Sequence, residues 1–390
     1  MTVRQFNDPT GGTPSTVGPQ LIDIFYQKKA LIEAAKLQFF GQLADVTSMP
    51  KNMGKKIKRY HYMPLLDDRN DNDQGLDAAG AASANGNLYG SSKDIGNIPG
   101  KMPVLSESGG RVNRVGFKRI ELVGTFEKFG FFDEYTQESV DFDTDAELTQ
   151  HINREMVMGA NEMTEDALQI DLLNAAGVIK YAGSATSNGT INSTSLVSYS
   201  DLMHLSIDLD NNRTPKGTKV IAGSRMVDTK TINAARIAYI GSELLPTFKA
   251  MVDLHDNPAF ISVEKYADAG NTVIGEVGAV DQVRLVVVPE MMKWAGAGAG
   301  IGDVTNCYET GGDFDVFPIL IVGDESFTTI GFQTDGKSVK FKITHKAPGE
   351  ATADRLDPYG ETGFMSIKWY YGFMCLRAER IGLIKTVGRL

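Results

Sequence analysis

One segment of the sequence has residue types and spacing that could bind a nucleotide. Residues 331–338, GFQTDGKS, satisfy the phosphate-loop template G-x-x-x-x-G-K-S/T through two glycines, Lys337 and Ser338. That chemistry needs a helix directly after the loop, so that backbone N–H groups and the helix dipole face the phosphates. The residues that follow alternate as in a β-strand instead, and Asp335 would place a carboxylate against the anion. Asp-Gly between two alternating runs is typical of a hairpin turn, so we predict a hairpin here and keep a nucleotide-binding enzyme as the alternative.

The other patterns that could carry chemistry are incomplete. The acidic run at residues 67–77 has the alternate spacing of a calcium loop, but Asp73 stands where glycine is needed and Ala79 where a bidentate glutamate is needed. It is therefore not an EF-hand, and only a weak cation site is left open. The histidines form no HxxxH or HExxH spacing, and GAGAGIG at 296–302 lacks a capped helix, so we predict a flexible tip there. We predict no catalytic, cofactor-binding or metal-binding residue and no cofactor, so the chain is not expected to be an enzyme.

Composition and charge define the broad class of the chain. With 390 residues and 42% hydrophobic composition, it can bury a sizeable core in one large domain or two to three modest ones. The sequence has no apolar run long enough for a membrane span and no secretory signal. Lys and Arg number 39 against 49 Asp and Glu, a net charge of −10, so the chain repels polyanions. Specific nucleic-acid recognition is not expected, although a shell could enclose DNA without binding it tightly.

The elements that would position functional residues follow from the periodicity of apolar side chains. Residues 21–40 predict an amphipathic arm helix, and residues 143–174 predict a long spine helix. Residues 200–323 alternate helical patterns with short apolar strands, including a helix from Ser224 to Tyr239, which predicts a mixed sheet covered by helices. From Phe327 onward the pattern is mostly that of strands. The apolar stripe predicted for the spine helix is Leu148, Ile152, Met156, Gly159, Met163, Ala167 and Ile170.

A long polar stretch lies between two strand-like segments, 55–63 and 119–127. Residues 67–109 are 43 residues rich in Asp, Asn, Gly, Ala and Ser, and a loop of this length inside a compact domain is usually functional or supported from outside the chain. We predict that it lies on a neighbouring subunit. Basic residues at its base are the predicted subunit interface, meeting an acidic surface of the neighbour: Lys55, Lys56, Lys58, Arg59, Arg111 and Arg114.

The order of these parts resembles a known family. The segments that carry the resemblance are EKFGFFDEYTQESVDFD before the spine helix, NTVIGEVGAVDQVRLVVVPEMMKW in the inserted region, and DPYGETGFMSIKWYYGFMCLRAERI near the C-terminus. Over residues 20–390 the chain resembles the major capsid proteins of tailed bacteriophages, of the Hong Kong 97-type fold, in the branch found in short-tailed phages.

The resemblance implies an α+β capsid fold with an N-terminal arm, an extended two-stranded loop, a long spine helix and an inserted axial α/β domain. The corresponding divisions are 1–53 for the N-terminal arm, 54–128 for the extended loop, 129–200 for the peripheral domain with the spine helix, 201–324 for the axial domain, and 325–390 for the peripheral-domain strands.

The function implied by the resemblance is that of a major capsid protein of the virion, made in the host cytoplasm. It would self-assemble through capsomers into an icosahedral shell that encloses the double-stranded DNA genome of a bacteriophage. Its partners would be further copies of itself in pentamers and hexamers, portal and scaffolding proteins, and DNA packaged without sequence-specific binding. Cement proteins are left open, and no membrane is expected. A cellular compartment shell of the same fold is a further alternative.

Overall fold

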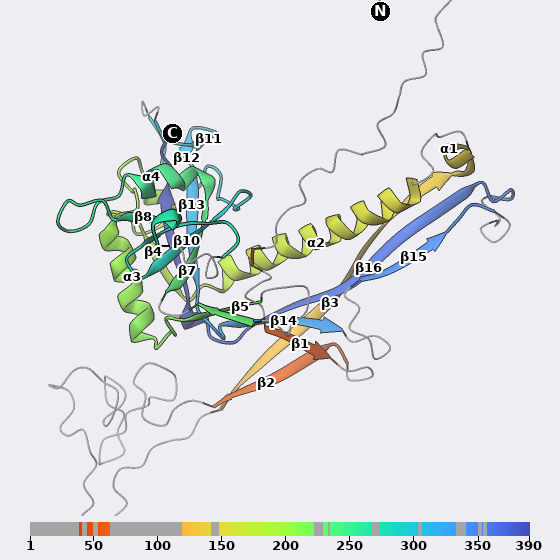
Figure 1. Ribbon diagram of the computed structural model, residues 1–390, viewed down its shortest axis with the longest axis horizontal. Coiled ribbons are helices and arrows are strands. Elements are labelled where there is room, and N and C mark those ends of the chain that lie inside the picture. Colours follow the sequence, from red (N-terminus) through yellow and green to blue (C-terminus); the bar gives the residue numbers. More distant parts are fainter. Residues whose placement is uncertain are drawn as a thin grey trace, which may run out of the picture.

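The computed structural model describes residues 39–40, 45–49, 54–62, 119–141, 148–221, 229–232, 235–266, 273–302, 306–332, 341–349, 353 and 357–390. These residues form a six-stranded and a seven-stranded sheet, joined by the long helix α2 (Leu148–Ala175) (Figure 1). The acidic run at 67–77 and the predicted interface residues Arg111 and Arg114 lie outside the described residues, as does the predicted arm helix up to residue 38. Phe39 and Phe40, predicted to end that helix, are not helical.

The six-stranded sheet is built around two long antiparallel strands, β3 (Arg119–Thr136) and β16 (Thr362–Cys375), which pair over most of their length. Residues of β16 are buried alternately, so that one face of the strand packs against α2. The strand order is β1–β14–β16–β3–β2, and β15 also pairs with β16. The remaining strands are β1 (Asp45–Met49), β2 (Lys56–Tyr62), β14 (Phe327–Phe332) and β15 (Phe341–Lys346).

The predicted spine helix is confirmed as α2, but its buried stripe differs from the prediction. Met156 and Ala160 pack against β16, whereas Leu168 and Leu172 pack against the seven-stranded sheet. Leu168 follows Met156 by 12 residues, and Leu172 follows Ala160 by 12 residues. Twelve residues make about three and a third helical turns, so the buried stripe moves around the helix by about a third of a turn. Residues that continue the first stripe are therefore exposed; Met163 is 55% and Ile170 47% exposed.

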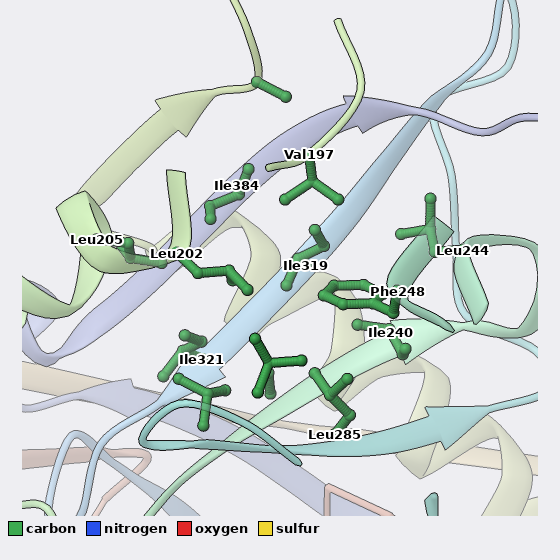
Figure 2. Packing of buried hydrophobic residues seen from close by; sticks show 14 of the residues in the cluster. Val197, Leu202, Leu205, Ile240, Leu244, Phe248, Leu285, Ile319, Ile321 and Ile384 are labelled. Carbon is green, nitrogen blue, oxygen red and sulfur yellow. The ribbon is translucent and has the colours of Figure 1, made fainter. Parts of the chain in front are cut away.

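The seven-stranded sheet is mixed, as predicted for the region after the spine helix. β10 pairs in parallel with β7 and β4 in parallel with β17, while the other pairs are antiparallel. α3 (Tyr199–Asn211) covers one face, where Leu202 and Leu205 belong to the same buried cluster as Ile240, Ile319 and Ile384 (Figure 2). The end of α2 packs against the other face. The strand order is β4 (Val178–Tyr181), β17 (Ile381–Val387), β13 (Val316–Val322), β7 (Arg236–Gly241), β10 (Val283–Val288), β9 (Glu276–Val280) and β8 (Phe260–Ser262).

Shorter elements complete the described chain. They are the helices α1 (Gln137–Asp141), α4 (Leu245–Lys249) and α5 (Val263–Tyr266), the 3-10 turns η3 (Asn188–Thr190), η4 (Ser242–Leu244) and η5 (Ala378–Arg380), and two small antiparallel pairs, β5 (Thr218–Ile221) with β6 (Thr229–Ile232) and β11 (Glu309–Thr310) with β12 (Asp313–Phe314).

The predicted hairpin turn at Asp335 and Gly336 lies outside the described residues, but the described strands on either side of it, β14 and β15, do not pair with each other as a hairpin requires. β14 pairs antiparallel with residues 372–375 of β16, and β15 pairs antiparallel with residues 364–369 of the same strand. Because β3 occupies the other edge of β16 over 362–373, β14 and β15 lie one after the other along one edge and run in the same direction. The Asp-Gly pair predicts a turn from neighbouring residues alone. The segments on either side instead pair with different parts of β16, which is 14 residues long.

Three further predictions differ from the structure. The predicted helix from Ser224 to Tyr239 is replaced, in its described part, by β6 and β7, and all six residues of β7 are buried, as suits a strand inside a sheet. The segment 296–302, predicted to be a flexible tip, is held by backbone hydrogen bonds, among them Gly298 N–H to the Phe314 carbonyl at 2.8 Å. The strand β17, grouped by the sequence with the other C-terminal strands, pairs with β13 and β4 in the seven-stranded sheet.

Candidate assembly surfaces

The strand β2 forms one edge of the six-stranded sheet. It pairs with β3 from Lys56 opposite Thr125 to Tyr62 opposite Arg119, and it stands last in the strand order. Within the described residues its other edge has no strand partner, and an unpaired edge is a template for pairing with another chain. Aromatic rings on this strand are also exposed, 44% for Tyr60 and 57% for Tyr62.

Four of the predicted interface residues lie together on or beside this edge. Lys55, Lys56 and Arg59 are exposed, and the charge of Lys58 is partly satisfied within the chain, since its Nζ lies 2.5 Å from Glu121 Oε1. The hydrogen bond and the charge of Glu121 raise the pKa of the Lys58 ammonium above its usual value. Among the predicted interface residues that the structure describes, Lys55, Lys56 and Arg59 are therefore the ones that are exposed and form no ion pair with another described residue.

Phe39 and Phe40 are anchored where α2 meets the seven-stranded sheet, which the sequence did not predict. Glu165 Oε1 accepts hydrogen bonds from the backbone N–H of Phe39 at 2.7 Å and of Phe40 at 2.6 Å. The Phe40 ring is 1% exposed and lies 4.6 Å from the Tyr239 ring, centroid to centroid. Gly275, with φ of +79°, leaves room for Phe39, since a Cβ there would lie 2.6 Å from that ring. No local periodicity could reveal this contact, because the partners lie 125 residues apart.

A second polar contact joins α2 to the six-stranded sheet. The Tyr371 hydroxyl donates a hydrogen bond of 2.7 Å to Asp171 Oδ2. Burial raises the pKa of Asp171 above its usual range, against the smaller opposing effect of the Tyr371 hydrogen bond. Burial also raises the pKa of Tyr371, so the pair is a structural contact between a buried phenol and a partly buried carboxyl group.

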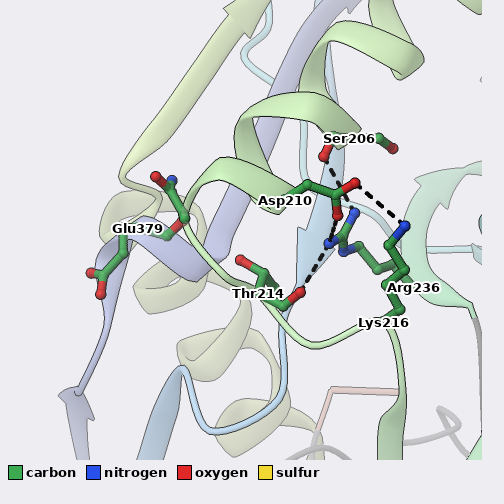
Figure 3. A network of polar contacts seen from close by, with 7 residues as sticks. Ser206, Asp210, Thr214, Lys216, Arg236 and Glu379 are labelled. Atoms are coloured by element: carbon green, nitrogen blue, oxygen red, sulfur yellow. Dashed lines mark hydrogen bonds and ion pairs between the residues drawn. The ribbon is translucent and has the colours of Figure 1, made fainter. Parts of the chain in front are cut away.

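A buried arginine fixes the end of α3 (Figure 3). Arg236 is 1% exposed; its Nη2 lies 2.5 Å from Asp210 Oδ1 and donates to the Thr214 carbonyl at 2.9 Å. Lys216 lies 3.4 Å from the other oxygen of Asp210. Burial raises the pKa of Asp210, but the hydrogen bonds and charges of Arg236 and Lys216 outweigh it and hold that pKa below its usual value. The network connects α3, the following loop and β7, and it serves the fold.

No group of three or more His, Cys, Asp or Glu side chains among the described residues is placed to hold a metal ion. None of the helices in the described part of the chain is long and apolar enough to cross a membrane. The described surface carries the basic β2 edge, which has no further strand partner among the described residues, and several exposed apolar side chains.

Comparison with known proteins identifies the assembly. The chain belongs to the phage capsid protein family, whose sequence model matches residues 120–386. The major capsid protein of Pseudomonas phage KPP21 is 64% identical over 387 residues, which cover 99% of this chain and 98% of that protein.

Solved structures share the fold at low sequence identity. The capsid of Ralstonia phage GP4 has a TM-score of 0.59 at 11% identity, covering 100% of this chain and 98% of that one. The capsid of cyanophage P-SCSP1u has a TM-score of 0.51 at 14% identity, covering 96% and 99%. The fold is the Hong Kong 97-type capsid fold, as the sequence predicted.

The chain is therefore a structural protein of the virion that forms the phage capsid shell, and it is not an enzyme. The nucleotide-binding alternative is wrong, because the structural neighbours are capsids and the element after GFQTDGKS is the strand β15 where a phosphate loop requires a helix.

Proposed function

We propose that copies of this chain close as pentamers and hexamers into an icosahedral shell that encloses a double-stranded DNA genome. The observation that carries the proposal is the outer edge of β2, which has no strand partner among the described residues. Three exposed basic residues, Lys55, Lys56 and Arg59, lie in β2 or directly before it. A compact monomer has no use for such an edge, whereas a neighbouring copy can cover it. Arg111 and Arg114 extend the proposed interface to the other side of the β2–β3 connection.

The two sheets have different roles in this proposal. The seven-stranded sheet with α3, which takes in β4 and β17 as well as most of residues 201–324, acts as the axial domain that meets its equivalents around each ring. The six-stranded sheet with α2 acts as the peripheral domain, and β2 with β3 forms the base of the extended loop. The net charge of −10 suits a wall that encloses DNA without adhering to it. Portal and scaffolding proteins are the further partners.

The proposal is tested by producing the protein alone and together with its neighbouring genes, separating the products on a density gradient and viewing them by electron microscopy. Closed shells, or rings of five and six copies, would support it. A small homogeneous oligomer in both preparations would refute it.

The interface is tested by the variant K55E/K56E/R59E. It should melt as the wild type does but leave subunits unassembled, because reversed charges would face the acidic surface of the neighbour. The R111E/R114E variant should behave in the same way. Normal shells from either variant would remove those residues from the interface.

A further inference from the structure

A group of lysines lies on the face of the six-stranded sheet that points away from α2. Directly opposed residues of antiparallel strands share a face. Ile343 and Ile367 are opposed and pack with Met156 of α2, so the adjacent opposed pair, Lys342 and Lys368, lies on the other face. Gly130 of β3 is opposite Lys368, and Lys128, two residues before Gly130, therefore lies on the same face.

This surface has the composition of an interface without its partner. The four lysines Lys128, Lys342, Lys346 and Lys368 are exposed, and none of them forms an ion pair with another described residue. Lys342 and Lys368 are like charges directly opposed, an arrangement that destabilises a sheet unless something outside compensates it. Phe132 lies among them on the same face, opposite Ser366, and is 64% exposed. We call these five residues the lysine face.

The chain itself contains a segment that complements the lysine face. Residues 65–77, LLDDRNDNDQGLD, carry five Asp and one Arg, a net charge of −4, together with three leucines. The acidic groups match the lysines, and the leucines match the exposed Phe132. We propose that the lysine face binds this acidic segment from a second copy of the chain. The inference rests on the proposed function, and it assigns the surface that receives the β2–β3 connection.

The distances along the sheet favour a second copy over the same copy. The β2–β3 connection leaves the sheet at Tyr62, which is opposed to Arg119, at the end remote from β15 (Figure 1). Lys128 is nine residues further along β3, about 30 Å away at the rise of a strand. Asp67 is five residues beyond Tyr62 and reaches at most about 17 Å. The first aspartates of the segment therefore cannot return to the lysine face of their own chain.

DNA is the other polyanion that such a surface could meet, and the surface fits it less well. A phosphate backbone would leave Phe132 facing charged oxygens, whereas a protein segment with leucines covers it. The chain as a whole has a net charge of −10 and therefore repels DNA unless the two surfaces fit each other closely. The acidic protein segment therefore fits both the charge and the apolar centre of the lysine face.

The test is a charge swap between copies, with the protein co-expressed with its neighbouring genes and shells separated from free subunits on a gradient. K342E/K368E should reduce the yield of shells by about tenfold or more, corresponding to about 1.4 kcal/mol per tenfold change, and D67K/D68K should do the same. The combined variant K342E/K368E/D67K/D68K should restore assembly, because each copy then presents the exchanged charges to the next. The control R154E, compared with K342E alone, reverses one charge at an exposed residue of α2, outside the lysine face and the proposed axial contacts, and should assemble normally.

A single variant separates assembly from folding. K342E places a glutamate opposite Lys368, which removes the like-charge pair and creates an attractive one. Its melting temperature should equal or exceed that of the wild type, while its shell yield falls. The inference would be refuted by normal shells from K342E/K368E, by a combined variant no better than either parent, or by an equal loss in the control. Normal shells that hold less DNA would show that the lysine face meets DNA instead. In each of these results the wild type still forms shells, so the proposed function would stand.

Discussion

Replacing Phe40 by alanine should destabilise the subunit strongly, because its ring is 1% exposed and contacts the ring of Tyr239. Truncating a fully buried phenylalanine costs about 3–5 kcal/mol, of which an aromatic pair accounts for about 0.5–1.5 kcal/mol. Phe40→Leu keeps an apolar group in the site and should cost about 1.5 kcal/mol or less. Phe132→Ala, at a ring that is 64% exposed, should change stability by no more than about 0.5 kcal/mol.

The assay is urea unfolding of the unassembled subunit, followed by tryptophan fluorescence. With an m-value of about 3 kcal/mol/M, the midpoint for Phe40→Ala should fall by about 1–1.7 M, and that for Phe132→Ala should stay within about 0.2 M of the wild type. A fall of less than about 0.3 M for Phe40→Ala would refute the reasoning, since it would mean that the ring does not fill the junction between α2 and the seven-stranded sheet.

Three further predictions concern α2 and the ordered loops. Glu165→Ala leaves two backbone N–H groups without their acceptor and should cost about 2–4 kcal/mol in urea unfolding, whereas Glu165→Gln keeps an oxygen there and should lose less than half of that; equal losses would contradict it. Burial raises the folded-state pKa of Asp171 above its unfolded value of about 3.9, so its contribution to stability is full below about pH 4 and declines as pH rises through the folded pKa. Asp171→Asn still accepts from Tyr371 and should be more stable than the wild type at pH 7 but not at pH 4; a gain independent of pH would exclude this explanation. Gly298→Ala should cost about 1–3 kcal/mol, because its Cβ would lie 2.7 Å from Phe314 Cβ, while Gly189→Ala, with nothing within 4 Å, should be nearly neutral; similar midpoints for the two would show that Gly298 is not confined.

The sequence predicted the elements whose side chains follow a regular period. β3 was recognised from the alternation over Arg119–Glu127, and Phe126 is buried while Glu121 and Glu127 are exposed. The spine helix was recognised from a long apolar stripe, and it is helical over Leu148–Ala175. These predictions hold because each element buries only one side at any point along its length, so that its apolar side chains recur with the period of a strand or a helix.

The predictions that fail are those in which a distant partner decides. Met163 and Ile170 continue the apolar stripe of Met156, yet they are exposed because α2 leaves one sheet and meets another along its length. Asp335 and Gly336 form a strong local turn signal, but β16 offers pairing to the strands on both sides. The lysine face shows only once the register of β3, β15 and β16 is known, since its members lie in three separate parts of the sequence.

The way α2 changes its buried stripe has a mechanical consequence for assembly. A helix of 28 residues spans about 42 Å, and each end is packed into a different sheet. The Tyr371–Asp171 hydrogen bond and the Phe39–Phe40 anchor on Glu165 add contacts where these layers meet. Rotation of one sheet against the other would break buried contacts at both ends of α2 at once. α2 therefore holds the β2 edge, the lysine face and the seven-stranded sheet in one body. In the proposed shell, a neighbour bound at one of these surfaces would fix where the next surface lies, as a closed shell built from repeated copies of one subunit requires.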